Sequence, residues 1–124
     1  MEFNFDNNIP IYIQLVEYIK KDIISGKYKP KERIPSVREL ALTLKVNPNT
    51  MQKALTYLEE QKLIYTERTN GKYVTDDQKL INKIKYEYAK NITDNYLLNM
   101  NDIGLTNEEI INYLKERIDK QWIF

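Results

Sequence analysis

Two apolar stripes with helical spacing lie close together in the segment 36–58. Hydrophobic side chains recur there at intervals of three and four residues, which is the period of one helix face. The stripe positions are Val37, Leu40, Ala41 and Leu44, followed by Met51, Ala54, Leu55 and Leu58. The spacing predicts two short helices joined by a tight turn at 45–46, which is the pattern of a helix-turn-helix.

The residues that open these two segments are suited to helix starts. Ser36 can act as an N-cap, and Glu39 three residues later has the spacing of a capping box. Asn47 can cap the second helix, and Pro48 fits its first position because the N–H that proline lacks has no helical partner there. The caps therefore support the helices that the stripes predict.

A third helix is predicted before this pair. It opens at Pro10 and ends near Ser25, and Gly26 supplies a left-handed C-cap. Its apolar stripe can cover the helix-turn-helix and consists of Tyr12, Leu15, Val16, Ile19 and Ile23. Basic residues gather at its end and in the following loop, and we interpret them as solvated charge in preference to phosphate contacts: Lys20, Lys21, Lys27, Lys29, Lys31 and Arg33.

A β-hairpin is predicted after the second helix of the pair. The runs 63–66 and 73–75 are β-prone, and Asn70-Gly71 between them favours a tight turn because both residues tolerate positive φ. A hairpin at this place is either a plain structural element or a wing beside the major-groove helix, and its adjacency to the helix-turn-helix favours the wing. Two cations near its tip could contact DNA, Arg68 and Lys72.

The segment 76–124 predicts two amphipathic helices, one running to about Leu98 and one beginning at the capping box Thr106–Glu109. So short a segment is too small for a stable core of its own. It can fold back on residues 1–75 or pair with the same segment of a second chain, and its size favours a homodimer. The expected interface residues are Ile81, Ile84, Tyr88, Ile92, Ile111, Leu114, Ile118 and Trp122.

The outward face of the second helix indicates the chemistry. Its positions between the buried ones carry amides, hydroxyls and one cation: Asn49, Thr50, Gln52, Lys53 and Thr56. Such side chains hydrogen-bond to base edges and phosphates. No acidic residue occurs from Leu40 to Leu58, and a helix that faces phosphates must avoid carboxylates. The alternative is a solvated polar face on an ordinary three-helix bundle.

Composition excludes several other classes of protein. The 124 residues include no cysteine and no histidine, so disulfides, thiol chemistry and the usual general base and metal ligand are absent. The carboxylate pairs Asp76-Asp77 and Glu108-Glu109 are each explained as charges at a helix start, and nothing indicates a pocket where two carboxylates converge, so we expect no enzyme, no metal site and no cofactor. No apolar run approaches the ~20 residues of a membrane span, and the start does not resemble a signal peptide, so we expect a cytoplasmic protein.

Charge is distributed unevenly along the chain. Residues 1–75 hold 12 Lys/Arg against 9 Asp/Glu, whereas residues 76–124 hold 7 against 9. A mildly basic N-terminal part and a mildly acidic C-terminal part fit a nucleic-acid-binding domain joined to a segment that does not bind nucleic acid. We therefore expect a DNA-binding domain in residues 1–75 and a helical dimerisation segment in residues 76–124, in a mostly α-helical chain.

Several multi-residue motifs follow one another in residues 10–75: Pro10-Ile11-Tyr12 with Gln14, Ile24 to Pro30, Arg33 to Ala41, Val46, Asn49-Thr50, Ala54-Leu55, Leu58-Glu59, Leu63-Ile64 and Gly71 to Val74. With these motifs in this order, residues 10–75 resemble the GntR family of bacterial transcription regulators. The short tail resembles the YtrA-like branch, because the larger effector-binding domains of other branches would not fit after the wing. The family implies a winged helix-turn-helix fold and DNA binding.

The resemblance also implies which residues contact DNA. Its Pro-Ser-x-Arg-Glu-Leu motif places Arg38 on the DNA, its recognition helix uses Asn47 and Thr50, and its wing glycine is Gly71. The chain departs from the family at Pro48 and Gln52, where arginine is common, and glutamine is suited to adenine, so we expect an A·T-leaning operator. The full expected DNA-contacting set is Ser36, Arg38, Asn47, Asn49, Thr50, Gln52, Lys53, Arg68, Gly71 and Lys72.

Members of the family usually repress, and YtrA-like members commonly accompany operons for ABC transporters. The partners implied are a double-stranded DNA operator and a second copy of the chain. A small-molecule effector could occupy an aromatic cleft between the helices of a dimer, although we interpret its residues mainly as dimer core and rim: Tyr86, Tyr88, Tyr96, Tyr113 and Trp122. The alternative function is a winged-helix module for protein partners without DNA readout.

Overall fold

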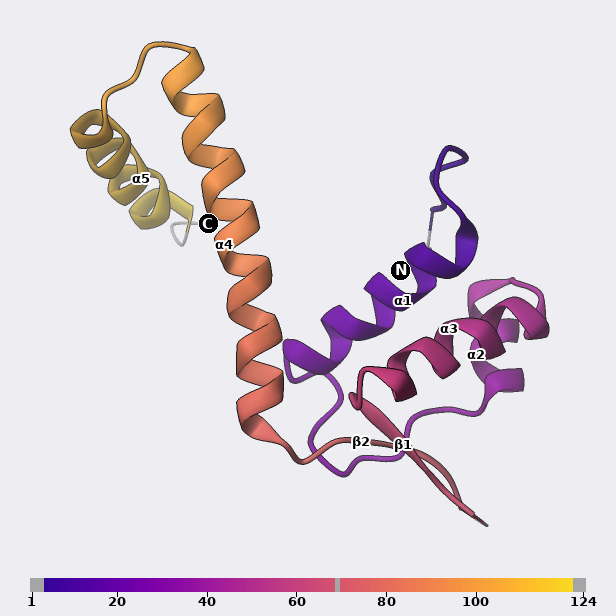
Figure 1. Ribbon diagram of the computed structural model, residues 1–124. Coiled ribbons are helices and arrows are strands. Elements are labelled where there is room, and N and C mark those ends of the chain that lie inside the picture. Colours follow the sequence, from indigo (N-terminus) through magenta and orange to yellow (C-terminus); the bar gives the residue numbers. More distant parts are fainter. Residues whose placement is uncertain (1–3, 69, 122–124) are drawn as a thin grey trace. The chain divides into compact units, whose positions relative to one another are not determined.

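A computed structural model describes residues 4–68 and 70–121 (Figure 1). Its elements are α1 (Ile11–Ile24), α2 (Val37–Leu44), α3 (Pro48–Glu60), β1 (Ile64–Glu67), β2 (Gly71–Val74), α4 (Gln78–Asp102) and α5 (Asn107–Gln121). The chain is mostly helical, with a winged helix-turn-helix followed by two C-terminal helices, which confirms the predicted fold class. It forms two compact units, Met1–Lys85 and Tyr86–Phe124, which divide within α4.

Helix α3 is the central element of the first unit, because it packs against α1, α2 and β1. The core between these elements is formed by side chains that the apolar stripes predicted, among them Leu15, Ile19, Met51, Leu55 and Leu58. Burying so many large aliphatic groups stabilises the unit by about 1.5–3 kcal/mol for each one. The inner face of α3 is thereby fixed, and its opposite face is left to solvent.

The predicted caps form at the helix-turn-helix. Ser36 Oγ accepts a hydrogen bond from the Glu39 N–H at 3.1 Å, and Asn47 Oδ1 accepts one from the Asn49 N–H at 2.7 Å. Between the helices, Lys45 adopts a left-handed conformation (φ 58°) as the C-cap of α2, which turns the chain into α3. The caps therefore fix both where α3 begins and the direction of its first turn.

The hairpin differs from the predicted Asn-Gly turn. The register pairs Ile64 with Val74 and Glu67 with Gly71, so Gly71 is the first residue of β2 and three residues connect the strands. A two-residue Asn70-Gly71 turn would place Val74 opposite Glu67. The observed register buries Ile64 and Val74 together on the core side of the sheet, and this burial outweighs the local turn preference.

A third, short extended segment borders the hairpin. Arg33 forms an antiparallel bridge with Tyr73, and the Ile34 N–H donates to the Lys72 carbonyl at 2.9 Å. Residues opposite each other in a sheet point to the same face, so Arg33 lies on the face of Tyr73. Successive residues of a strand point to opposite faces, so Ile34 and Val74 both lie on the other face, in the core. Tyr65 stacks on Tyr73 across that outer face, with ring centroids 5.8 Å apart.

The C-terminal helices also have defined starts. Asp77 Oδ1 accepts from the Leu80 N–H at 3.1 Å before α4, and Thr106 and Glu109 close the predicted capping box of α5 in both directions. One interface expectation requires correction here: Ile81 is only 3% exposed, because the chain itself covers it, so it is not available to a second chain. No helix in the described part of the chain is both long and apolar enough to cross a membrane.

Candidate nucleic-acid interface

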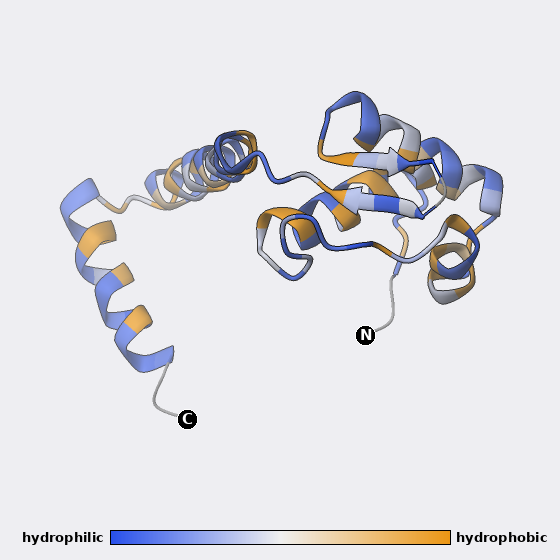
Figure 2. Cartoon of the chain, turned by 90° about the horizontal axis from the view of Figure 1, so that it is seen from below, coloured by the Kyte–Doolittle hydropathy of each residue, from blue (hydrophilic) through white to orange (hydrophobic). Residues whose placement is uncertain are grey.

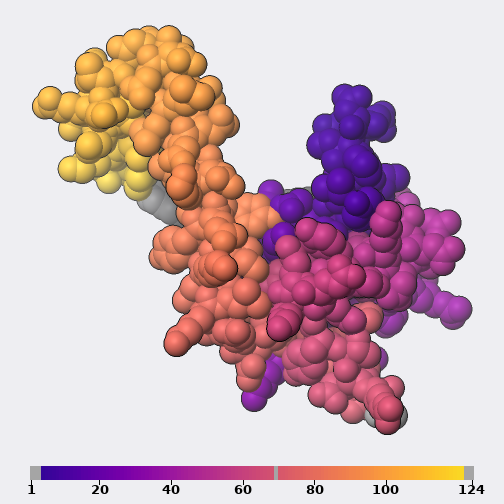
Figure 3. Space-filling view, viewed as in Figure 1, coloured from indigo at the N-terminus to yellow at the C-terminus, as the bar shows by residue number. Residues whose placement is uncertain are grey.

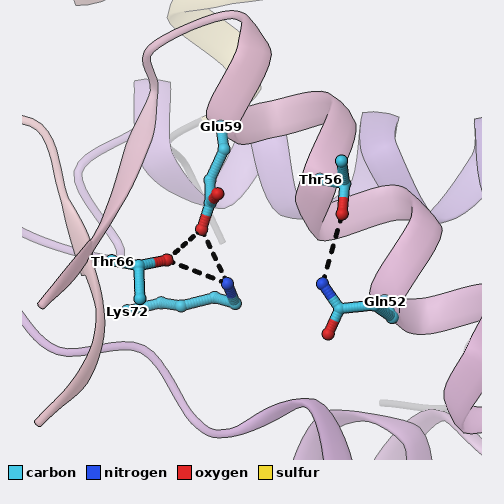
Figure 4. Close-up of polar contacts among 5 residues, drawn as sticks. All are labelled: Gln52, Thr56, Glu59, Thr66 and Lys72. Carbon is cyan, nitrogen blue, oxygen red and sulfur yellow. Dashed lines mark hydrogen bonds and ion pairs between the residues drawn. The ribbon is translucent and has the colours of Figure 1, made fainter. Parts of the chain in front are cut away.

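The outward face of α3 carries a row of exposed polar side chains. Asn49, Gln52 and Thr56 are exposed along it, and Thr50 is half-buried in the first turn. Gln52 Nε2 donates to Thr56 Oγ1 at 3.2 Å, one helical turn away (Figure 4). That bond leaves the Gln52 carbonyl and its second amide proton for a ligand, which is the donor–acceptor pair that matches the major-groove edge of adenine.

Arg38 lies at the start of α2 and carries no ion pair among the described residues. It is exposed, two residues after the N-cap Ser36. The N-terminus of a helix presents unpaired N–H groups and a partial positive charge, and a cation is unfavourable there for the helix itself. A helix start with an added guanidinium is suited to an anion, and phosphate is the anion that DNA supplies.

Lys53 extends toward α1. Its ammonium lies 3.9 Å from the centroid of the Tyr12 ring, a cation–π contact between the two helices. The side chain is nevertheless exposed, so the contact holds its position without removing it from solvent. Lys53 therefore borders the polar face of α3 on the side of α1.

Lys72 differs from the expectation of a free phosphate contact. Its ammonium lies 2.6 Å from Glu59 Oε1 and 3.0 Å from Thr66 Oγ1, and the Thr66 hydroxyl also donates to the Glu59 carboxylate (Figure 4). The Lys72 side chain is only 17% exposed. Because its charge is paired within the chain, it joins the hairpin to the end of α3 and is not a free cation.

The same cluster predicts a pH dependence. Burial alone would raise the pKa of the Glu59 carboxyl, but the hydrogen bonds from Lys72 and Thr66 outweigh it and hold the pKa below the usual 4.5. The ionised carboxylate therefore stabilises the fold above pH 4.5, and this contribution is lost as the pH falls through the lowered pKa.

We expect Glu59→Gln to lower the free energy of unfolding at pH 7 and to have a vanishing effect in acid. Urea denaturation between pH 7 and pH 3 measures this difference. The matched control is Glu60→Gln on the adjacent, exposed side chain, which is expected to have little effect at any pH. A destabilisation by Glu59→Gln that stays constant down to pH 3 would contradict the assignment.

The hairpin projects from the first unit (Figure 3). Arg68 is exposed near its tip, as predicted. Gly71 is half-buried, with a φ of +108° that favours glycine. The tip therefore offers one exposed cation, and the end of β2 nearest the tip offers a residue without a side chain.

Helix α5 exposes an apolar stripe on an otherwise polar surface, visible as separated hydrophobic bands in Figure 2. The exposed fractions are 55% for Ile111, 42% for Leu114 and 47% for Ile118, whereas Ile110 is buried. On α4, Ile92 is 66% exposed, and Ile84 and Tyr88 are half-buried. Trp122 lies outside the described residues. All three of these predicted interface residues on α5 are therefore exposed, whereas on α4 only Ile92 is.

Comparison with known proteins identifies this arrangement. Residues 11–74 match the model of the bacterial regulatory proteins of the gntR family. The chain belongs to the GntR family. It is 32% identical over 111 residues to the HTH-type transcriptional repressor YtrA of Bacillus subtilis, covering 89% of this chain and 85% of that protein. The match extends into the C-terminal helices, so the chain is a small, YtrA-like GntR protein.

Two solved structures agree with the fold. A GntR family transcriptional regulator from Listeria monocytogenes is 43% identical and superposes with a TM-score of 0.81, covering 90% of this chain and 98% of that one. The DNA-binding domain of AraR in complex with operator ORR3 is 32% identical with a TM-score of 0.53, covering 60% of this chain and 88% of that one. The GntR protein described here is accordingly a DNA-binding transcriptional regulator and not an enzyme.

Sequence reasoning missed the partners of two site residues in this GntR protein, Gln52 and Lys72. Thr56 was expected on the polar face but not as the residue that orients Gln52, although their spacing of four is the signal for such a pair. The pairing of Lys72 with Glu59, 13 residues earlier in the chain, had no local signal. It arises only once the hairpin packs against the end of α3.

Proposed function

We propose that the protein is a cytoplasmic, homodimeric repressor that binds a two-fold symmetric operator. The observation that carries the proposal is the exposed face of α3, which presents amides and hydroxyls without a carboxylate from Leu40 to Leu58. Such a face can enter the negatively charged major groove without repulsion. Repression itself is proposed from the likeness to YtrA, a transcriptional repressor.

In this proposal the contacts divide into two kinds. Side chains of the first two turns of α3 read bases, and Gln52 favours adenine, so the operator leans toward A·T. The start of α2 holds the DNA backbone through Ser36 and Arg38, and the hairpin lies beside the groove with Arg68 at its tip. The remaining proposed contacts are Asn47, Asn49, Thr50, Lys53 and Gly71.

Dimerisation would follow from the C-terminal segment. The exposed stripe of Ile111, Leu114 and Ile118 is supported as an interface because large aliphatic groups gain free energy when they leave water. Two copies paired there could present two α3 helices to half-sites on one DNA duplex. On the family resemblance we further propose a transporter operon as the target, which the genes beside this one would test.

Transcription in a purified system tests whether the protein represses or activates its target promoter. The template carries a promoter that overlaps a duplex sequence retained by the protein from a random pool. We expect added protein to reduce the transcript in proportion to operator occupancy, whereas a promoter without that sequence stays unaffected. An increase in transcript, or an equal reduction from both templates, would contradict a sequence-specific repressor.

A further inference from the structure

Two cations lie on opposite faces of the wing at β2, and their surroundings differ. Lys72 lies on the core side of the hairpin, where Glu59 neutralises it. Arg33 lies on the outer side, is exposed, and forms no ion pair within the described part of the chain. A charge that is already paired in the protein adds little attraction for phosphate, whereas an unpaired one adds its full share. Arg33 is therefore the cation at this site that remains for DNA.

The Arg33 guanidinium rests against the backbone of Gly71. A Cβ placed on Gly71 would lie 3.0 Å from Arg33 Nε and 3.3 Å from one of its terminal nitrogens. Since Arg33 pairs with Tyr73, its side chain runs two residues along β2 toward the tip to reach this place. The missing side chain at Gly71 thus leaves room for the guanidinium, in addition to permitting the positive φ.

Arg33 also lies beside the start of α2 in the sequence. Ser36 follows it by three positions, and an extended chain of that length spans about 10 Å. It therefore connects the two regions of the first unit that the proposed function brings to the backbone, which are the α2 N-terminus with Arg38 and the hairpin with Gly71. A guanidinium at this place continues the positive charge of Arg38 toward the wing.

We propose that Arg33, supported by Gly71, is the phosphate-binding residue beside β2 of the wing and that Lys72 is a positioning residue that does not contact DNA. The inference rests on the proposed function, because it requires that the winged face binds DNA. It departs from the interpretation of Arg33 as one member of a solvated basic cluster, and it reassigns the role first expected of Lys72.

Salt dependence of binding to a duplex of random sequence tests this assignment, because a phosphate contact does not depend on the operator. Fluorescence anisotropy gives the slope of log Kobs against log[salt] for the full chain. We expect Arg33→Gln to make the slope shallower by about 0.9 for each subunit, or about 1.8 for a dimer. Arg33→Lys keeps the charge and is expected to retain most of the slope.

Two further variants serve as controls. Glu59→Gln combined with Lys72→Met removes the internal ion pair without changing net charge and is expected to leave the slope unchanged. Lys21→Gln removes one exposed cation near the end of α1 and is also expected to leave it unchanged. Thermal unfolding of each variant verifies that it is folded at the temperature of the assay.

The possible results separate the two proposals. An unchanged slope for Arg33→Gln, or a loss of about 0.9 per subunit in the Glu59–Lys72 double variant, would overturn the assignment of Arg33. An equal loss in Lys21→Gln would overturn it as well, because it would show an effect of net charge alone. A wild-type chain that binds neither random nor selected DNA would instead contradict the proposed function itself.

Discussion

Leu114→Glu is expected to convert the proposed homodimer to a monomer and to weaken operator binding by about 100-fold or more. Leu114 is the central residue of the exposed stripe on α5, so a carboxylate there remains in solvent in the single chain and must be desolvated in a dimer. Two linked recognition helices bind with an avidity that exceeds either one by a factor of about 10² to 10⁴. Losing the partner removes that factor without altering the DNA-contacting face.

The matched control is Asn112→Glu, which adds the same charge to the same helix at another exposed position. It is expected to stay dimeric and to bind normally. Sedimentation equilibrium gives the oligomeric state, and fluorescence anisotropy gives the affinity for the operator. A Leu114→Glu variant that remains dimeric would remove the α5 stripe from the interface. A monomeric variant with wild-type affinity would contradict the need for two subunits.

Arg38→Ala is expected to weaken operator binding, and the loss reaches about 1–3 kcal/mol, or roughly 5- to 150-fold, if the guanidinium contacts a base as well as the backbone. Arg38 is exposed at the N-terminal end of α2, where a cation is unfavourable for the helix and alanine is a better helix former. The substitution should therefore leave stability equal or slightly higher while binding falls. This opposite response distinguishes a DNA contact from a structural role.

Arg117→Ala on α5 is the control for the loss of one guanidinium, and it is expected to leave operator affinity within twofold, roughly the scatter of surface substitutions. Anisotropy titrations at fixed salt measure both variants, and urea denaturation reports their stability. If Arg38 contacts a base, the variant should also discriminate less between the four base pairs at one operator position. Unchanged affinity in Arg38→Ala would remove this residue from the interface.

Most of the helical frame follows from the sequence because its determinants are local. The caps at Ser36, Asn47 and Thr106 act over two or three residues, and the structure forms each of them. The apolar stripes likewise predict most of the buried side chains of α1, α2 and α3, because a helix of fixed period has only one face to offer to a core, although Tyr12 and Val37 are only half-buried. The residues of α3 that lie outside its buried stripe then form its exposed polar face.

The features that sequence reasoning missed depend on contacts between distant parts of the chain. The hairpin register was not set by Asn70-Gly71 but by burying Ile64 opposite Val74. That register places Lys72 on the side of Glu59, which no local pattern indicates. Ile81 has the spacing of an interface residue, yet the chain itself buries it. Periodicity identifies an apolar face, but it does not tell which surface will cover that face.

The account depends most on two α3 helices reading one duplex together, and selection of bound oligonucleotides from a random pool measures this directly. The predicted result is a motif repeated with two-fold symmetry, with half-site centres about 10–10.5 base pairs apart or at a multiple of that spacing, and with A·T pairs favoured where Gln52 lies. Retained sequences with one unrepeated motif, or with no shared motif, would contradict it.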